Sequence, residues 1–244
     1  KKFLDKIEYI QIDHNPQKLL KISDIDTEEI KMFKEIENAL TIENYQRNFI
    51  SRGLKDVNDE DIIMISDLDE IPNLDRVDFK LYKNKIFLFK QYFFHYKFDL
   101  YLKDFFFFGT KACSKKNFIT PQWLRNIKNK KYDFYRIDTL FSNSKYINVK
   151  IIENGGWHFT NIMTAEKLEY KLKSYLHHPE IPQNVDKKSL SDLILSKQLN
   201  YDHQADKKSN RYIKKDLNIF DLNLLPNYIK NNKDKFSEWF SKDL

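Results

Sequence analysis

Residues 62–72 read Ile62-Ile63-Met64-Ile65-Ser66-Asp67-Leu68-Asp69-Glu70-Ile71-Pro72, and the predicted fold follows from this stretch. Its first four residues form an unbroken apolar run, which is typical of a strand buried on both faces of a largely parallel sheet. The acidic residues follow at the carboxyl end of that strand, where open α/β sheets bind their ligands. A short helix is expected next, over residues 73–82. We therefore predict an α/β fold with a mostly parallel central sheet flanked by helices.

Asp67 and Asp69 are the candidate metal ligands. The chain holds two other Asp-x-Asp triplets, but only this one directly follows an apolar strand. In an extended backbone residues i and i+2 point the same way, so the two carboxylates are expected to converge while Leu68 turns into the core. Converging carboxylates repel unless a cation lies between them, and Mg²⁺ or Mn²⁺ suits such oxygen ligands. The alternative is that both residues only cap a helix beginning near Pro72.

A second motif, Gly155-Gly156-Trp157-His158, follows a strand predicted over residues 146–152. The chain has only four glycines in 244 residues, so an adjacent pair indicates a backbone requirement. Adjacent glycines permit positive φ or a close approach to a ligand, and their N–H groups could face a phosphate. Trp157 could stack on a sugar, and His158 could ligate a metal or bind a pyrophosphate. The alternative is that His158 is an ordinary polar residue without a function.

Periodicity and composition indicate the remaining elements. Apolar residues spaced by three to five predict one or two helices over residues 27–52, and the aromatic-rich residues 86–108 favour strands. A short strand is expected over residues 6–13. Helices are expected over residues 165–176 and 189–199 and, as a surface helix, over 228–240. We therefore divide the chain into a catalytic core, residues 1–164, and a helical C-terminal region, residues 165–244, packed on that core.

The overall composition limits the partners. The formal net charge is +6 and the pI is about 9.0, which favours anionic partners, but the lysines are spread through the chain, so we do not expect nucleic-acid binding. Cys113 is the single cysteine, which excludes an intramolecular disulfide and favours a reducing compartment. No apolar run approaches the roughly 20 residues that a transmembrane helix needs, although peripheral membrane contact stays open. The abundance of Lys, Asn and Ile suggests a bacterial, cytoplasmic protein.

Taken together, these segments resemble glycosyltransferase family 17, which includes the β-1,4-mannosyl-glycoprotein β-1,4-N-acetylglucosaminyltransferases, and especially its bacterial members. The resemblance covers most of residues 1 to about 180. It is carried, in order, by residues 6–14, 43–48 (Glu43-Asn44-Tyr45-Gln46-Arg47-Asn48), 61–72, 109–112 (Gly109-Thr110-Lys111-Ala112) and 154–160, followed by Lys171, Ser174, His178 and Glu180. The acidic motif and the Gly-Gly-Trp-His motif occurring together are far more specific than either motif alone.

The resemblance implies a GT-A-like fold and an inverting, metal-dependent transfer of N-acetylglucosamine from a UDP donor to a glycan or lipid-linked glycan. The basic charge of the chain suits work near the inner face of a bacterial membrane. Mn²⁺ or Mg²⁺ would be held by Asp69, with help from Asp67 and His158. Glu70, or else Glu43, would be the general base. The expected donor or phosphate contacts are Arg47, Lys111, Gly155, Gly156, Trp157 and His158.

The sequence departs from the family in one respect, and two other functions are also compatible with it. The resemblance begins inside the family's sequence, so we expect this chain to lack an N-terminal segment that helps to form the nucleotide pocket. A non-catalytic glycan-binding or nucleic-acid-binding module would instead use the aromatic residues 87–108 and scattered lysines. Another metal-dependent, phosphate-handling enzyme could use the same acidic turn.

Overall fold

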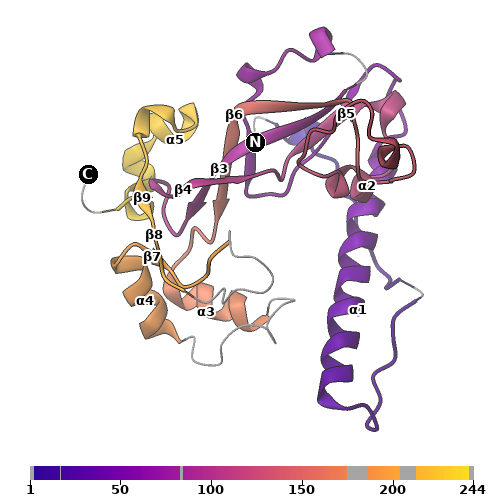
Figure 1. Cartoon of the computed structure of the whole chain (residues 1–244). Helices are drawn as coiled ribbons and strands as arrows, with labels where there is room; N and C mark the ends of the chain where they lie inside the picture. Colours follow the sequence, from indigo (N-terminus) through magenta and orange to yellow (C-terminus); the bar gives the residue numbers. More distant parts are fainter. Residues whose placement is uncertain (1–2, 17, 83–84, 175–185, 204–212, 242–244) are drawn as a thin grey trace. The chain divides into compact units, whose positions relative to one another are not determined.

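The computed structural model describes residues 3–16, 18–82, 85–174, 186–203 and 213–241 (Figure 1). The chain divides into two compact units. The first unit comprises Lys1–Ile65, Lys83–Ile86 and Ala112–Asn148, and the second comprises Ser66–Tyr82, Phe87–Lys111 and Val149–Leu244. The predicted boundary after residue 164 therefore lies inside the second unit. Among the described residues, no helix is both long and apolar enough to cross a membrane.

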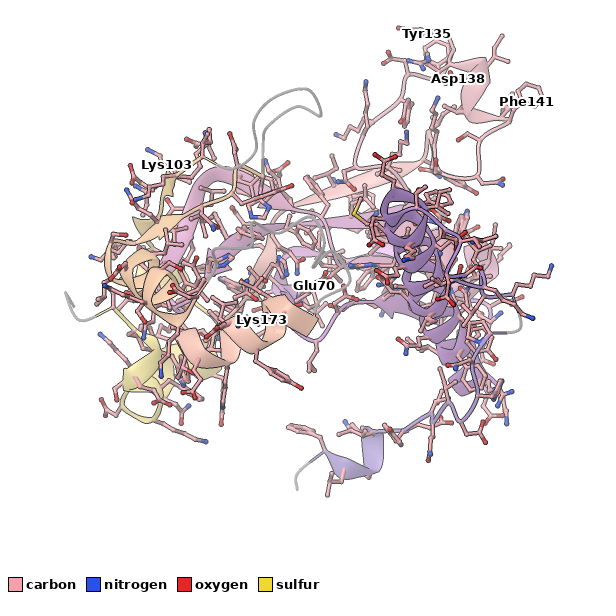
Figure 2. All side chains as sticks on the ribbon, turned by 90° about the horizontal axis from the view of Figure 1, so that it is seen from below. Glu70, Lys103, Tyr135, Asp138, Phe141 and Lys173 are labelled. Atoms are coloured by element: carbon pink, nitrogen blue, oxygen red, sulfur yellow. The ribbon has the colours of Figure 1, made fainter. Side chains whose placement is uncertain are left out.

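The first unit contains the long helix α1 (Glu28–Phe49), the short helix α2 (Pro121–Asn126) and the strand β1 (Ile62–Ile65). It also contains all but the first residue of β5 (Lys111–Ser114), which lies beside β1. Helix α1 begins where the Thr27 side chain caps Ile30 N, which confirms the helix predicted over residues 27–52. Helix α2 begins in the same way, because Thr120 Oγ1 accepts from Trp123 N. A loop around the 3₁₀ helix η6 (Ile137–Thr139) completes this unit, and its residues Tyr135, Asp138 and Phe141 are labelled in Figure 2.

The second unit is built on antiparallel strands. β3 (Ile86–His95) pairs with β4 (Leu100–Phe107), and β4 pairs with β9 (Asn218–Ile219). On its other side β3 neighbours β6 (Val149–Thr160), which in turn pairs with β2 (Glu70–Pro72). A separate two-stranded ladder joins β7 (Gln198–Leu199) to β8 (Lys215–Asp216). The strands expected within residues 86–108 are therefore confirmed.

The predicted parallel, GT-A-like sheet is wrong. Among the residues that the structure describes, seven strands belong to the main sheet, and every strand pair whose register is given is antiparallel. Only residues 96–99 separate β3 from β4, whereas a parallel connection needs a crossover of roughly a dozen residues or more. The apolar run of β1 predicted a strand buried on both faces, and this is wrong. Its residues alternate between partly buried and buried, and β1 lies at the end of the strand order.

Several predicted elements also differ from the structure. Residues 7–13 form no strand, and exposed Ile7 and Tyr9 show that this segment has little to pack against. Residues 73–82 form two 3₁₀ turns, η3 (Leu74–Arg76) and η4 (Phe79–Tyr82), rather than a helix. The C-terminal region is not purely helical, because strands β7, β8 and β9 lie between its helices α3 (Ala165–Ser174), α4 (Lys187–Leu195) and α5 (Asn227–Asn231). The predicted surface helix over 228–240 continues after α5 only as the 3₁₀ segment η9 (Lys233–Trp239).

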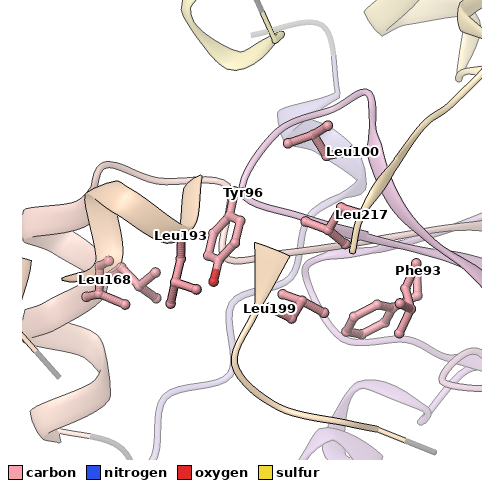
Figure 3. Packing of buried hydrophobic residues seen from close by; sticks show 9 residues of the cluster. Phe93, Tyr96, Leu100, Leu168, Leu193, Leu199 and Leu217 are labelled. Atoms are coloured by element: carbon pink, nitrogen blue, oxygen red, sulfur yellow. The ribbon is translucent and has the colours of Figure 1, made fainter. Parts of the chain in front are cut away.

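Two apolar clusters hold the second unit together. The first joins β3 and β4 to α3, α4 and the β7–β8 region, through buried residues that include Phe93, Tyr96, Leu100, Leu168, Leu193, Leu199 and Leu217 (Figure 3). The second surrounds Phe94 and Phe159 with Phe220, Leu225, Ile229 and Phe240. Residues beyond 164 therefore pack directly on the strands, and the second unit depends on them for its core.

The adjacent glycines of β6 meet a packing requirement. A Cβ atom on Gly155 would lie 2.7 Å from Ile152 O and 2.8 Å from Lys90 N. On Gly156, whose φ is +135°, a Cβ would lie only 2.1 Å from Ile71 O. No side chain fits at either position, so the pair allows β6 to approach its neighbouring strands closely.

We predict that Gly156→Ala destabilises the fold by about 3 kcal/mol, because the new methyl group meets rigid backbone and the φ value disfavours any L residue. Urea denaturation of the purified chain measures this change. Gly53→Ala is the matched control, since a Cβ there would meet the flexible end of Ile10 at 3.2 Å, and we expect a cost within about 1 kcal/mol. Equal losses in the two variants would contradict the prediction.

Candidate functional site

The ladder between β2 and β6 brings together the two motifs that the sequence singled out. Its register places Glu70 opposite His158, Ile71 opposite Trp157 and Pro72 opposite Gly156. Main-chain bonds flank the ladder, because Phe159 N donates to Asp69 O at 2.8 Å and Asn73 N donates to Gly155 O at 2.8 Å. The acidic turn and the Gly-Gly-Trp-His motif therefore form one local structure within the second unit.

The acidic motif forms a turn rather than an extended segment. Glu70 N donates to Asp67 O at 3.1 Å, which closes the turn, and Leu68 at its tip is fully exposed. The expectation that Leu68 turns into the core is therefore wrong, and the alternating geometry of a strand does not align Asp67 with Asp69. The helix-capping alternative is also excluded, because strand β2, and no helix, includes Pro72.

Asp69 and His158 form the central polar pair. His158 Nε2 lies 3.3 Å from Asp69 Oδ2, with the His158 side chain 10% exposed and the Asp69 side chain 39% exposed. The His158 ring stacks on Phe107 at a centroid distance of 4.1 Å and contacts Phe93 edge-on at 5.3 Å. Its Nδ1 atom is buried and finds no hydrogen-bond partner in the described part of the chain. The pair thus combines a solvent-accessible carboxylate with an imidazole fixed by aromatic packing.

The environment favours the ionised form of Asp69. Partial burial opposes ionisation, but the hydrogen bond and charge of His158 and the positive charge of Lys171 outweigh it, so the pKa of Asp69 lies below its ordinary value. Asp69 is therefore a carboxylate at neutral pH and can accept a cation or a hydrogen-bond donor.

Glu70 is buried in a network of donors behind this pair. Its Oε2 atom accepts from Asp67 N at 3.1 Å, from Thr110 Oγ1 at 3.1 Å and from Ser66 Oγ at 3.4 Å. Its Oε1 atom occupies the space beside Gly109, where a Cβ atom would approach within 1.8 Å. These contacts give Glu70 a positioning role in the acidic turn, and its role as general base stays a prediction.

The remaining predicted site residues of the second unit have other surroundings. Trp157 points away from His158, since neighbouring strand residues face opposite sides, and its Nε1 donates to Leu224 O at 2.9 Å. Lys111 is almost completely buried. The close packing of β6 against its neighbours already explains why residues 155 and 156 are glycines. Their roles in binding a donor or a phosphate therefore stay predictions.

Glu43 and Arg47 belong to the first unit. Arg47 Nη2 lies 2.7 Å from Glu43 Oε1, and Arg47 Nη1 donates to Gln122 Oε1. Next to them a pocket of about 440 Å³ is lined by Asn48, Ile119, Thr120, Gln122, Trp123, Asn126, Asn143 and Ser144. The structure thus pairs Glu43 with Arg47. The role of Glu43 as a general base and the role of Arg47 as a donor or phosphate contact stay predictions. His178 and Glu180 of the resemblance lie outside the described residues.

A polar chain lies beside the site, and of its members only Lys171 was named from the sequence. Lys171 Nζ donates to Asn161 Oδ1 at 2.7 Å, and Asn161 Nδ2 lies 3.1 Å from His95 Nε2. Burial lowers the pKa of His95 well below its ordinary value, and the positive charges of His203, Lys171 and His158 add to this effect. His95 is therefore neutral in the folded protein. A lone histidine in an aromatic run carries no sequence signal for such a role.

Thr110→Val tests the network around Glu70. Removal of the hydroxyl leaves a buried carboxylate with one donor fewer, so we expect a loss of about 1–3 kcal/mol in the free energy of unfolding. Thr110→Ser keeps the hydroxyl and should lose clearly less. Chemical denaturation compares the two variants, and a Thr110→Val variant as stable as Thr110→Ser and the wild type would contradict a stabilising role of this hydrogen bond.

The neutral state of His95 predicts a pH dependence of stability. Its folded pKa is lowered, so below the ordinary value of 6.5 the unfolded chain binds a proton that the folded chain does not. Stability should therefore fall as the pH drops below that value, with this residue contributing on the order of 1 kcal/mol per pH unit. Denaturation curves at several pH values measure the slope, which His95→Gln should reduce. An unchanged slope in the variant would refute the assignment.

No family model, no curated protein and no solved structure matches the chain. The resemblance to the glycosyltransferase family therefore rests on the quoted motifs.

Proposed function

We propose that this chain is a metal-dependent glycosyltransferase that moves a sugar from a nucleotide-sugar donor, with UDP-N-acetylglucosamine the first candidate, to a glycan or lipid-linked glycan hydroxyl with inversion. The observation that carries the proposal is the β2–β6 register, which sets an ionised, accessible Asp69 against His158. A bound Mn²⁺ or Mg²⁺ would stabilise the diphosphate leaving group. We place the reaction in the cytoplasm, where an acceptor lipid would be met at the inner face of the membrane.

The residues fit a cation that is shared with the substrate. Asp69 offers a carboxylate, and His158 presents its Nε2 to Asp69 Oδ2 at 3.3 Å, so a cation that replaces this contact would meet both groups. No group of three or more His, Cys, Asp or Glu residues able to hold a metal occurs among the residues that the structure describes. Magnesium-type sites commonly use one or two protein carboxylates, with substrate phosphates and water completing the shell. We therefore expect the metal to bind mainly together with the nucleotide, with Asp67 as an additional ligand.

The chain's own residues would fix the donor end of the reaction. The bond from Phe159 N to Asp69 O fixes the backbone of Asp69 beside His158. The bond from Asp67 N to Glu70 Oε2 fixes the turn that carries Asp67. A cation held by these fixed groups would stabilise the leaving group without reorganisation during the reaction. Inversion also requires a base on the acceptor side, for which Glu70 and Glu43 remain the candidates.

The burial of aromatic residues weakens the binding-module alternative. Stacking of bases or sugars requires exposed rings, yet most aromatic residues of β3 are buried, namely Phe87, Phe89, Phe93 and Phe94. These rings form the core of the second unit instead. A phosphate-handling enzyme would use the same pair, and product analysis separates it from a transferase, because only the transferase yields a glycoside.

Thermal-shift titration with UDP and UDP-N-acetylglucosamine, with and without Mn²⁺, tests the proposal. A ligand at a hundred times its Kd stabilises the folded state by about 3 kcal/mol, which raises the Tm by several degrees. We expect this shift only when nucleotide and metal are both present, and we expect Asp69→Asn to abolish it. Asp75→Asn, an exposed acidic residue of η3, is the control and should behave like the wild type.

A shift that persists in Asp69→Asn, or that needs no metal, would contradict the assignment of the pair. If the shift occurs as expected, incubation with UDP-N-acetylglucosamine and an acceptor screen identifies the product. Release of a phosphorylated sugar without any glycoside would favour the phosphate-handling alternative.

A further inference from the structure

A loop of the first unit exposes an unusual number of large apolar side chains. This aromatic loop, residues 132–145, surrounds η6, and Figure 2 shows Tyr135 and Phe141 at its outer end. Five of its large apolar side chains are exposed, namely Phe134 at 87%, Tyr135 at 65%, Ile137 at 69%, Leu140 at 76% and Phe141 at 85%. Exposed apolar residues are ordinarily scattered, so their concentration within eight positions indicates a surface that binds something.

The aromatic loop is held by its own hydrogen bonds. Arg136 N donates to Asp133 O at 3.1 Å, Thr139 N donates to Arg136 O at 3.1 Å, and Leu140 N donates to Ile137 O at 3.0 Å. Thr139, the buried residue in η6, adds a side-chain bond to Arg136 O at 2.6 Å. Because these bonds already pair several of its backbone groups, the loop can enter a less polar medium at a lower cost than a loop without them.

The charges around the aromatic loop are mainly positive. Residues 128–145 contain five basic residues, Lys128, Lys130, Lys131, Arg136 and Lys145, against the acids Asp133 and Asp138, a net charge of 5 − 2 = +3. Both acids are already engaged, since Asp133 accepts from Tyr135 and Asp138 accepts from Arg136 and Lys145. The bonds from Arg136 and Lys145 also lower the pKa of Asp138, so it stays ionised and paired.

The three lysines at the start of this segment are available to an external anion. Lys128, Lys130 and Lys131 are exposed, and none has an acidic partner among the described residues. Lys130 instead lies over the Tyr132 ring, 6.0 Å from its centroid. A row of lysines therefore leads directly into the exposed aromatic residues.

We propose that the aromatic loop docks this protein on an anionic lipid bilayer. Phe134, Phe141 and their apolar neighbours would enter the interfacial region, where aromatic side chains are favoured, while the lysines would contact lipid phosphates. A stable protein partner ordinarily needs about 800 Å² on each surface, whereas shallow membrane insertion needs only a few projecting side chains beside cations. This inference rests on the loop alone and does not depend on the proposed reaction.

Vesicle co-sedimentation with the full chain tests the inference. We expect binding to vesicles of equal parts phosphatidylglycerol and phosphatidylcholine, weaker binding to phosphatidylcholine alone, and a loss of binding at high salt. The double variant Phe134→Ser/Phe141→Ser should weaken binding at least about tenfold by removing apolar area. The double variant Lys130→Gln/Lys131→Gln should weaken binding roughly tenfold on the anionic vesicles only.

The control is Tyr9→Ser/Ile25→Ser, which removes apolar side chains of the same unit that are 85% and 92% exposed and should leave vesicle binding unchanged. All these side chains are exposed, so an unchanged Tm shows that a variant still folds. Wild-type protein that ignores anionic vesicles, or a Phe134/Phe141 variant that binds like wild type, would overturn the proposal. Self-association that the same variant abolishes would assign the surface to a second copy and would overturn it as well.

Discussion

The antiparallel pairing of β2 with β6 is the constraint that brings the acidic turn and His158 together. Opposite residues of such a pair lie on the same face, so Glu70 and His158 share one face while Ile71 and Trp157 share the other. A slip of one residue would exchange these faces and would place Trp157, rather than His158, beside the acidic turn. Gly156 secures the register, because the close approach to Ile71 O leaves no room for any other residue.

Burial and polarity are balanced differently on the two faces. On the Trp157 face, aromatic rings from β3, β6 and the C-terminal segments form an apolar cluster. On the His158 face, a buried carboxylate and a buried imidazole lie beside Phe107, which is an environment that penalises unpaired charge. The donors around Glu70 compensate this penalty, whereas His158 Nδ1 is left without a described partner. The polar face thus contains a buried nitrogen whose hydrogen bond no described residue supplies.

The elements that the sequence predicted well are those encoded locally. Helix α1 has a capping threonine and a continuous helical spacing, and β3 and β4 are dense in residues that favour strands. Strand direction is not encoded in this way, because an apolar run looks the same in parallel and antiparallel sheets. The turn after β3 carries no glycine or proline, although Tyr96 adopts a φ of 67°, so the hairpin gave no recognisable signal. The double glycine was recognised as a backbone requirement, but the sequence could not distinguish approach to a strand from approach to a ligand.

In the antiparallel sheet the two predicted motifs still lie together, but a strand ladder and not the end of a parallel strand brings them together. The prediction placed the acidic residues at the end of a parallel strand, where the fold itself would create a binding crevice. In the structure one short ladder instead brings the two motifs together, because its main-chain bonds fix the acidic turn at Asp69 and its glycines bring β6 close to its neighbours. Function depends on the geometry of a site and not on the fold that carries it. The ionised, accessible Asp69 beside an aromatic-packed His158 is therefore the feature from which the chemistry of this protein has to be argued, whatever the direction of the strands around it.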